Sequence, residues 1–257
     1  MPNYSATFLG TGTSQGVPVI ACECNVCQSS NKKDKRLRTS FLISVDDKNI
    51  VIDTGPDFRQ QMLANEVKMV DAVLFTHEHK DHVAGLDDIR SYNFKSNRDM
   101  DVYASLRVQE ALRREFSYIF ADYKYPGVPQ VKLHEIGDEA FILFESEKVT
   151  PINVMHYKLP VKGFRIGGLT YITDANFISD EEKEKIKGSK VLVLNALRRE
   201  HHISHFTLSE ALELIEELKP EKAYLTHISH LLGLHSEVQK ELPENVDLAF
   251  DGLKIEF

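Results

Sequence analysis

The sequence predicts an α/β fold, in which short strands alternate with helices along the whole chain. Five apolar runs rich in Val, Ile, Tyr and Thr are too short for typical helices and favour extended structure. Apolar residues recur at helical spacing in segments between these runs. Each run ends in a residue of a type that binds metal: NIVID at Asp53, AVLFTH at His77, INVMH at His156, LTYITD at Asp174 and KAYLTH at His227. Groups at strand ends commonly form the site of an α/β protein, so we expect these residues to build one.

Two segments carry the helical pattern most clearly, residues 105–116 and residues 207–218. The second begins with Thr207, and Glu210 follows three residues later, which is a capping-box signature. Residues 118–174 are mainly strand-like and are punctuated by prolines. The similar runs VLFTH and AYLTH suggest two related halves, although five residues do not establish a repeat.

Composition places the chain among ordinary globular proteins, with 42% hydrophobic and 27% charged residues. No stretch approaches the roughly 18 apolar residues of a membrane span, and the N-terminus lacks the pattern of a signal peptide. We therefore expect a cytoplasmic protein without membrane contact. The formal charge of −8 disfavours a protein that holds long nucleic acid by neutralising its phosphates.

The segment THEHKDH, residues 76–82, is the decisive chemical motif. His77 and His79 are two apart just past a strand, so both project to the same side. Asp81 and His82 follow where a helix, HVAGLDDIR, is expected to begin. Four donors within six residues exceed the needs of one open catalytic ion, and the later strand-end residues add three more. Seven donors suffice for two ions that share a carboxylate, whereas the alternative is a solvated polar loop.

These motifs resemble the metallo-β-lactamase superfamily of metal-dependent hydrolases. THEHKDH matches the signature of that superfamily, and Asp53 in IDTGPD and the later strand-end residues follow in its order. The resemblance extends over nearly the whole chain and implies an αββα four-layer sandwich, with the site at one edge of two facing mixed sheets. Residues 1–257 are accordingly expected to form a single hydrolase domain.

The resemblance also implies a role for each donor. Asp53 matches a position that supports the metal-bearing loops without binding metal. Zinc or manganese is expected, because His and Asp ligands suit both ions. One ion is expected at His77, His79 and His156, and the other at Asp81, His82 and His227, with Asp174 bridging the two.

Three cysteines form a second donor cluster, Cys22, Cys24 and Cys27 in the polar loop ACECNVC. They offer three soft ligands to a structural zinc, which needs a fourth; the alternative is three idle thiols. His227 and His230 are three apart in THISH, so on a helical turn one can face the catalytic pair while the other serves a second centre.

Within the superfamily, GTGTSQGVPVIACECNVC and RTS at residues 38–40 resemble the phosphoribosyl cyclic phosphate phosphodiesterase group of the carbon–phosphorus lyase pathway. Members of this group hold a structural zinc with such a cysteine loop and a His three residues after the last catalytic His. The resemblance therefore implies that His230 is the fourth zinc ligand. Arg38 in the RTS match is a candidate to reach the site.

The donor set indicates hydrolysis, because two close metals clamp the attacking and leaving oxygens and lower the pKa of water to about 7. We expect a hydroxide held by both metals to be the nucleophile, with Asp81 among the catalytic residues. His205 before the capped helix resembles a His of the phosphodiesterase branch that contacts phosphate and assists the leaving group; His202 is the alternative carrier of this role. Amides at that helix start are expected to receive a phosphate oxygen, and His201 to face solvent.

The expected substrate is a small or cyclic phosphodiester, similar to phosphoribosyl cyclic phosphate. The alternatives are a tRNA 3′-processing-type endoribonuclease, a protein resembling those of pyrroloquinoline quinone biosynthesis, and a non-catalytic metal-binding protein of the same fold. The basic run NKKDKRLR, residues 31–38, is expected to be a solvated loop rather than a nucleic-acid contact. His134 and His235 fit no motif and are expected to be surface or structural residues. A homodimer is left open.

Overall fold

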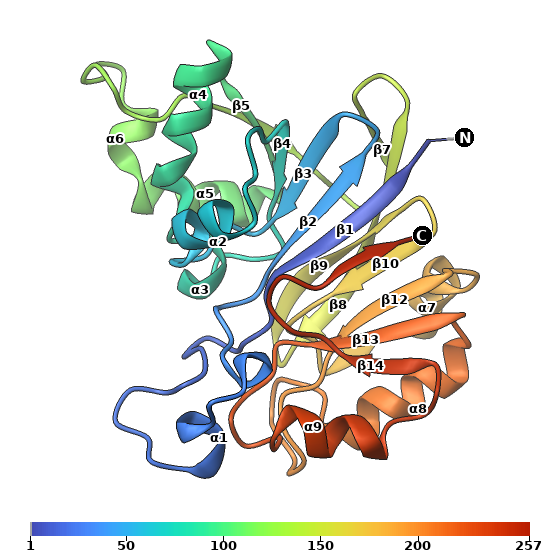
Figure 1. Cartoon of the computed structure of the whole chain (residues 1–257). Helices are drawn as coiled ribbons and strands as arrows, with labels where there is room; N and C mark the ends of the chain where they lie inside the picture. Colours follow the sequence, from blue (N-terminus) through green and yellow to red (C-terminus); the bar gives the residue numbers. More distant parts are fainter. Residues whose placement is uncertain (1) are drawn as a thin grey trace.

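Two mixed β-sheets face each other in the computed structural model, which describes residues 2–257 (Figure 1). The first sheet runs in the order β15 (Lys254–Glu256), β1 (Tyr4–Gly10), β2 (Ser40–Val45), β3 (Lys48–Ile52), β4 (Ala72–Leu74), β5 (Met100–Ala104) and β6 (Val131–Glu135). The second runs in the order β11 (Phe177–Ile178), β8 (Glu147–His156), β9 (Leu159–Ile166), β10 (Leu169–Ile172), β12 (Val191–Asn195), β13 (Lys222–Thr226) and β14 (Val246–Leu248), with β7 (Phe141–Leu143) also paired to β8.

Helices cover the outer face of each sheet, so the layers follow the order helix, sheet, sheet, helix (Figure 1). The first sheet packs against α2 (Phe58–Ala64), α3 (Lys80–Val83), η2 (Leu86–Ile89), α4 (Arg90–Ser96), α5 (Leu106–Glu115) and α6 (Ser117–Phe120). The second packs against α7 (Asp180–Ile186), α8 (Leu208–Leu218) and α9 (His235–Val238), which η3 (Gln239–Glu241) follows. The predicted αββα sandwich is thereby confirmed. No helix within residues 2–257 is long and apolar enough to cross a bilayer.

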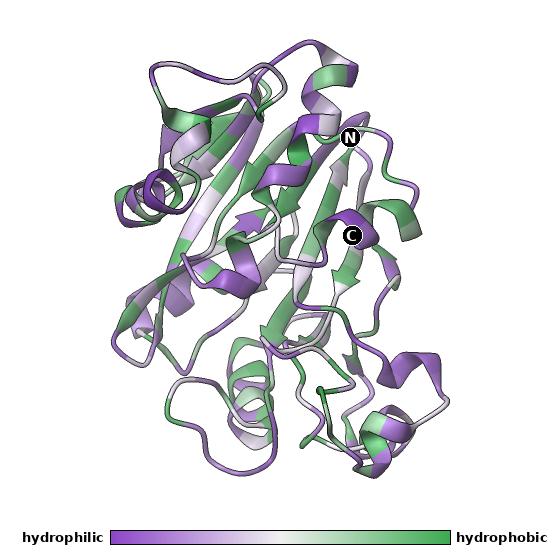
Figure 2. Ribbon diagram, turned by 90° about the vertical axis from the view of Figure 1, so that its left-hand side faces the viewer, coloured by the Kyte–Doolittle hydropathy of each residue, from purple (hydrophilic) through white to green (hydrophobic). Residues whose placement is uncertain are grey.

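Successive side chains of a strand point to opposite faces of the sheet, and this alternation produces three apolar layers, one between the sheets and one under each set of helices. Ile50 and Ile52 of β3 face the core between the sheets, whereas Val51 faces the helices. Between the sheets the ring of Phe41 stacks on that of Tyr171, with ring centroids 4.7 Å apart. Hydrophobic residues accordingly concentrate in the strands, and hydrophilic residues in the loops (Figure 2).

The five predicted strand-like runs coincide with β3, β4, β8, β10 and β13, and the two predicted helices with α5 and α8. The capping box at Thr207 and Glu210 is present. The single helix expected over HVAGLDDIR is wrong: α3 stops at Val83 and the 3₁₀ turn η2 follows Gly85. The residue at this break must be a glycine, because a Cβ at position 85 would lie 2.1 Å from the carbonyl oxygen of Gly55.

The N-terminal segment between β1 and β2 contains α1 (Asn25–Gln28) and η1 (Lys32–Asp34) and packs against the C-terminal part of the chain. The expectation of a solvated loop over residues 31–38 is wrong for Arg36, which is buried. Its guanidinium donates to Thr11 Oγ1 at 2.7 Å and to the carbonyl of Ala249 at 2.6 Å. These hydrogen bonds satisfy the buried charge and fasten the segment to the sandwich.

Candidate metal centre

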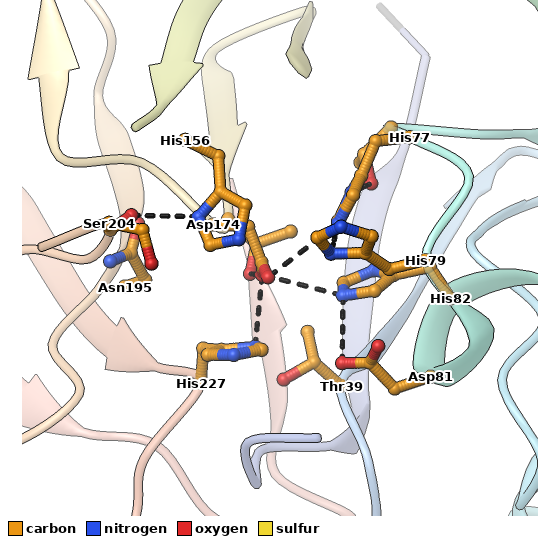
Figure 3. Close-up of polar contacts among 12 residues, drawn as sticks. Thr39, His77, His79, Asp81, His82, His156, Asp174, Asn195, Ser204 and His227 are labelled. Atoms are coloured by element: carbon orange, nitrogen blue, oxygen red, sulfur yellow. Dashed lines mark hydrogen bonds and ion pairs between the residues drawn. The ribbon is translucent and has the colours of Figure 1, made fainter. Parts of the chain in front are cut away.

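Residues at the ends of β3, β4, β8, β10 and β13 converge where the edges of the two sheets meet (Figure 3). Three of them, Asp53, Asp174 and His227, have positive φ angles of 65°, 57° and 55°. Non-glycine residues rarely adopt this left-handed conformation, and such strained positions cluster at functional sites. The backbone bends sharply after each strand and thereby turns the polar side chain toward the centre.

The carboxylate of Asp174 lies in the middle of the cluster, as the dashed lines of Figure 3 show. Its Oδ2 lies 3.7 Å from His77 Nε2. Its Oδ1 lies 3.4 Å from His82 Nε2 and 3.0 Å from His227 Nδ1. One carboxylate therefore faces histidines of both expected metal sites. Asp174 belongs to three sets of possible ligands, and within each set the ligand atoms lie within 4.8 Å of one another. The other members of the sets are His77 and His79, His82 and His227, and His156 and His205.

Asp53 orients two of the histidines without entering the centre. It accepts hydrogen bonds from Thr76 Oγ1 at 2.8 Å and from His82 Nδ1 at 2.7 Å. Because the Thr76 hydroxyl donates to Asp53, it accepts from His77 Nδ1 at 2.9 Å. Both imidazoles thus carry a proton on Nδ1, and their Nε2 atoms are left to face Asp174.

His156 is fixed in the same way by the backbone. Its Nδ1 donates to the carbonyl oxygen of Ser204 at 2.7 Å, which leaves the lone pair of Nε2 free (Figure 3). The Asn195 amide accepts from Ala175 N at 2.8 Å and donates to Ala175 O at 3.0 Å. These contacts hold the loop that carries the central carboxylate.

Some of the ligand atoms pair with one another, whereas others lack any partner that would satisfy them without a cation. His77 Nε2 carries a lone pair and can accept a hydrogen bond from His79 Nδ1 at 3.0 Å. His82 Nε2 is buried without a hydrogen-bond partner among residues 2–257, and Asp81 Oδ2 lies 3.2 Å from it. Buried polar atoms are normally satisfied, so this arrangement fits divalent metal ions.

Burial and neighbouring charges together set the charge states of the residues in this cluster. It lowers the pKa of His77, His79 and His227, and so favours the neutral imidazoles that metals require. Burial alone would raise the pKa of Asp174, but His227 and His82 outweigh it and hold the carboxyl ionised. Burial would likewise lower the pKa of His82, but three carboxylates, Asp174 foremost, raise it well above its ordinary value. The raised pKa favours a second proton on His82, at Nε2, which is the atom that would otherwise bind a metal ion.

The cysteine loop forms a separate cluster with His230. The Nδ1 atom of His230 lies 3.3 Å from the sulfurs of Cys22 and Cys24 and 3.6 Å from that of Cys27. A tetrahedral zinc with bonds of about 2.3 Å to sulfur and 2.0 Å to nitrogen places these atoms roughly 3.5 Å apart. The four side chains therefore have the spacing of a zinc site.

The helical turn expected over THISH is wrong. His227 has a φ of 55°, and Ile228 forms a parallel bridge with Gly12 instead of continuing a turn. This pairing still separates the roles of the two histidines. His227 faces Asp174, and His230 reaches the cysteine loop.

The three histidines of REHHISH occupy different environments. His201 is exposed, as expected, whereas His205 is buried and lies 4.5 Å from the ring of His156 and 4.8 Å from that of His227 between centroids. Burial lowers the pKa of His205 to about 2, so the imidazole is neutral without substrate. The ring of His202 lies 5.1 Å from that of His205, and its pKa is also lowered by burial.

Two expectations near the site concern a helix start and an arginine. Three amides at the start of α8 are paired within the chain: Thr207 N donates to the Glu210 carboxylate, Glu210 N to the Thr207 hydroxyl, and Leu208 N to the carbonyl of Arg198. These three are thus not free for a phosphate oxygen. Arg38 forms an ion pair with Asp57 at 2.7 Å.

The unassigned histidines are structural. His134 Nε2 forms a hydrogen bond with Asp101 Oδ1 at 2.6 Å. His235 is buried, its backbone N–H donates to Asp34 Oδ1 at 2.7 Å, and its ring nitrogen lies 3.3 Å from Arg36.

Sequence reasoning missed Asn195 and Ser204. Asn195 ends the apolar run VLVLN, so the pattern that singled out the five metal-competent residues also contained it. Ser204 acts through its backbone carbonyl, which leaves no signal in the sequence.

A family model described as β-lactamase superfamily domain matches residues 48–228, which include the whole His and Asp cluster. This chain belongs to the metallo-β-lactamase superfamily. The matched range ends before His230 and begins after the cysteine loop, so the second cluster lies outside it.

Several known proteins are similar to this chain and indicate which part of the superfamily it resembles. One similar solved structure is that of a new diphosphatase from the PhnP family, whose sequence is 41% identical. The match covers 99% of this chain and 98% of that chain, with a TM-score of 0.92. Coenzyme PQQ synthesis protein B of Methylorubrum extorquens is 33% identical over 222 residues, 73% of this chain and 71% of that protein. Octanoyltransferase of Porphyromonas gingivalis is 42% identical over 249 residues, 96% of this chain. The chain spans only half the length of that octanoyltransferase.

The metallo-β-lactamase fold also extends to zinc-bound PqqB of Methylobacterium extorquens, with 20% identity and a TM-score of 0.81. At this identity the likeness concerns the fold alone. The family and the donor clusters together identify a metal-dependent hydrolase of the PhnP type.

Proposed function

We propose that the protein is a phosphodiesterase that cleaves a small or cyclic phosphodiester, such as a phosphoribosyl cyclic phosphate, with two divalent ions. The carboxylate of Asp174 between two groups of histidines is the observation that carries the proposal. Two ions at these donors would acidify a water molecule and neutralise charge on the phosphate. His77, His79 and His156 would hold one ion and Asp81, His82 and His227 the other, and Asp174 would serve both.

His205 binds the phosphate and protonates the leaving oxygen, with His202 as the alternative acid. The neutral imidazole of His205 can donate a hydrogen bond to a phosphate oxygen from its buried position. A bound phosphate, being anionic, raises the pKa of an adjacent imidazole, which is the condition for proton donation. His205 lies close enough to His156 and His227 to face the same substrate group.

The second cluster is proposed to hold a structural zinc on Cys22, Cys24, Cys27 and His230. Sulfur donors favour zinc, whereas the His and Asp donors suit either zinc or manganese. The negative charge of −8 supports a small substrate over long nucleic acid.

A second candidate is hydrolysis of a diphosphate. The diphosphatase of the PhnP family with 41% identity favours it. Both reactions break a phosphorus–oxygen bond in line with an attacking water, so the same donors serve either one.

A substrate panel tests the proposal. The protein, loaded with Zn²⁺ or Mn²⁺, is offered bis(p-nitrophenyl) phosphate, a ribose cyclic phosphate, a dinucleotide diphosphate, a tRNA precursor and a thioester. We expect hydrolysis of the first two, or of the diphosphate in the second candidate. Cleavage of the tRNA precursor or the thioester alone would overturn the proposal, and turnover of none would favour a non-catalytic metal-binding protein.

The role of His205 has a separate test. His205→Ala should slow the cleavage of esters with alkoxide leaving groups more than that of nitrophenyl esters, because nitrophenolate needs no proton. Equal losses on both would mean that His205 only positions the phosphate. His201→Ala, which changes an exposed histidine of the same segment, is the matched control.

A further inference from the structure

A cavity of about 400 Å³ opens beside the metal centre. His79 and His156 form one wall, and Tyr157, Lys158, Ile203 and Arg107 contribute to the remainder. This volume is within the range of small-molecule sites. The cavity borders two of the proposed metal ligands, so a substrate whose phosphate lies on the metals extends its remaining part into it.

Tyr157 is held in a costly backbone conformation at this cavity. It is the first of the two turn residues between β8 and β9, where His156 pairs with Leu159. Its φ of 58° belongs to the left-handed region that favours glycine or asparagine in such turns. Its ring is half-exposed, so packing in the core does not account for a tyrosine here. Strain of this kind persists where the surroundings enforce it, and it is typical of ligand sites.

Asn176 fastens both apolar walls of the cavity. Its Oδ1 accepts from the backbone N–H of Tyr157 at 2.7 Å, and its Nδ2 donates to the carbonyl of Ile203 at 3.2 Å. Ile203 is 59% exposed. These hydrogen bonds thus hold the backbone of two residues that line the cavity next to the metal ligands.

Positive charge lies beside this pair. The ammonium of Lys158 lies 5.3 Å from the centroid of the Tyr157 ring. Arg107 forms an ion pair with Glu78 at 2.6 Å and keeps its side chain largely exposed. The cavity therefore combines an aromatic face, an aliphatic side chain and cations, which suits an anionic ligand with a flat ring.

We propose that this cavity is the specificity subsite of the enzyme and binds a nucleobase-like heterocycle of a nucleoside phosphate. Tyr157 and Ile203 contact the ring system, the positive charge of Lys158 favours an anionic ligand, and Asn176 is a positioning residue. The proposal rests on the proposed function, because it assumes that the phosphate binds at the metals.

Equilibrium binding to the metal-loaded protein tests the subsite directly. AMP and ribose 5-phosphate share ribose and phosphate and differ in the base, so calorimetry with both isolates the contribution of the base. We expect AMP to bind about tenfold more tightly, as base stacking on an aromatic side chain provides. Tyr157→Asn relieves the backbone strain and removes the ring, so this variant should unfold no more easily yet bind both ligands equally. Tyr157→Phe should keep the preference.

Further variants separate recognition from folding. Ile203→Ala and Asn176→Ala should reduce the preference for AMP, whereas Ile142→Ala, at a 54% exposed isoleucine of β7 outside the cavity, should leave it unchanged. Equal affinities for AMP and ribose 5-phosphate in the wild-type protein, or an unchanged preference in Tyr157→Asn, would overturn the subsite. If AMP is preferred but no phosphodiester is hydrolysed, the proposed function fails and the subsite stands. If bis(p-nitrophenyl) phosphate is hydrolysed without a preference for AMP, the subsite alone fails.

Discussion

The two donor clusters of this protein differ in how completely their donors enclose a site. The cysteine cluster is closed: His230 lies 3.3–3.6 Å from three sulfurs, and these four groups match the four ligands that a tetrahedral structural zinc requires. The His and Asp cluster is open, because its donors surround Asp174 in several groups and leave buried atoms such as His82 Nε2 unpartnered. Closed sites stabilise a fold, whereas open sites leave positions for water and substrate.

The clusters also differ in what supports them. Backbone amides serve the cysteines, since Cys27 N donates to the sulfur of Cys24 at 3.4 Å and Val19 N to that of Cys27 at 3.3 Å. A side chain, that of Asp53, orients His82, while the backbone carbonyl of Ser204 holds His156. A single substitution can therefore disable the support of the open cluster while the closed one stays intact.

The largest expected effect is that of Asp174→Asn. An amide cannot supply charge to both metal sites, so kcat/KM for bis(p-nitrophenyl) phosphate should fall by roughly three orders of magnitude or more, with loss of the catalytic ions. Asp101→Asn, which alters a carboxylate paired with His134 outside the cluster, should retain activity. Activity close to wild type in Asp174→Asn would remove the bridging role.

Asp53→Asn should have a smaller effect, because Asp53 acts through other residues. The amide weakens the acceptor for His82 Nδ1 and for Thr76, and support of this kind is typically worth 10- to 100-fold in metal affinity. Chelator competition measures the change. Asp71→Asn, at a buried carboxylate paired with Arg98 away from the centre, is the control and should leave metal affinity unchanged.

Cys24→Ser should change activity less than about threefold but reduce the metal content by about one ion and lower Tm by more than about 5 °C. Loss of this zinc should lower stability more than activity, because the closed cluster fastens the N-terminal loop to the segment that carries His230. Elemental analysis and thermal unfolding measure it. A variant that loses every ion would show that the two clusters are not independent.

The thiols of the metal-stripped protein should differ in reactivity. The backbone N–H of Cys27 lowers the pKa of the Cys24 thiol to about 6, while burial raises that of Cys27 to about 11. At pH 7 Cys24 is therefore mainly thiolate and should be alkylated at least tenfold faster than Cys27, even though a less basic thiolate is less nucleophilic. Below pH 6 protonation should slow the reaction of Cys24 by about tenfold per pH unit. Mass spectrometry after iodoacetamide treatment measures both rates, and equal rates would contradict the assignment.

Much of the open cluster could be predicted from the sequence, because its donors follow apolar strands and strand ends meet at one edge of a sandwich. The expected helical turn at THISH failed since Ile228 pairs with Gly12, which lies more than 200 residues earlier in the chain. Arg36 was expected in a solvated loop because its neighbours are charged, yet tertiary hydrogen bonds bury it. Contacts made by backbone atoms, such as the carbonyl of Ser204, have no side-chain signal at all.

Metal content per chain tests the central claim most directly. Elemental analysis of the purified protein should give about three divalent ions, of which a mild chelator removes two together with all hydrolytic activity and leaves one zinc. Asp174→Asn should retain that zinc, and Cys24→Ser should lose it. A single ion per chain in the active wild-type protein would contradict the account, because the open cluster would then not hold a pair of metals.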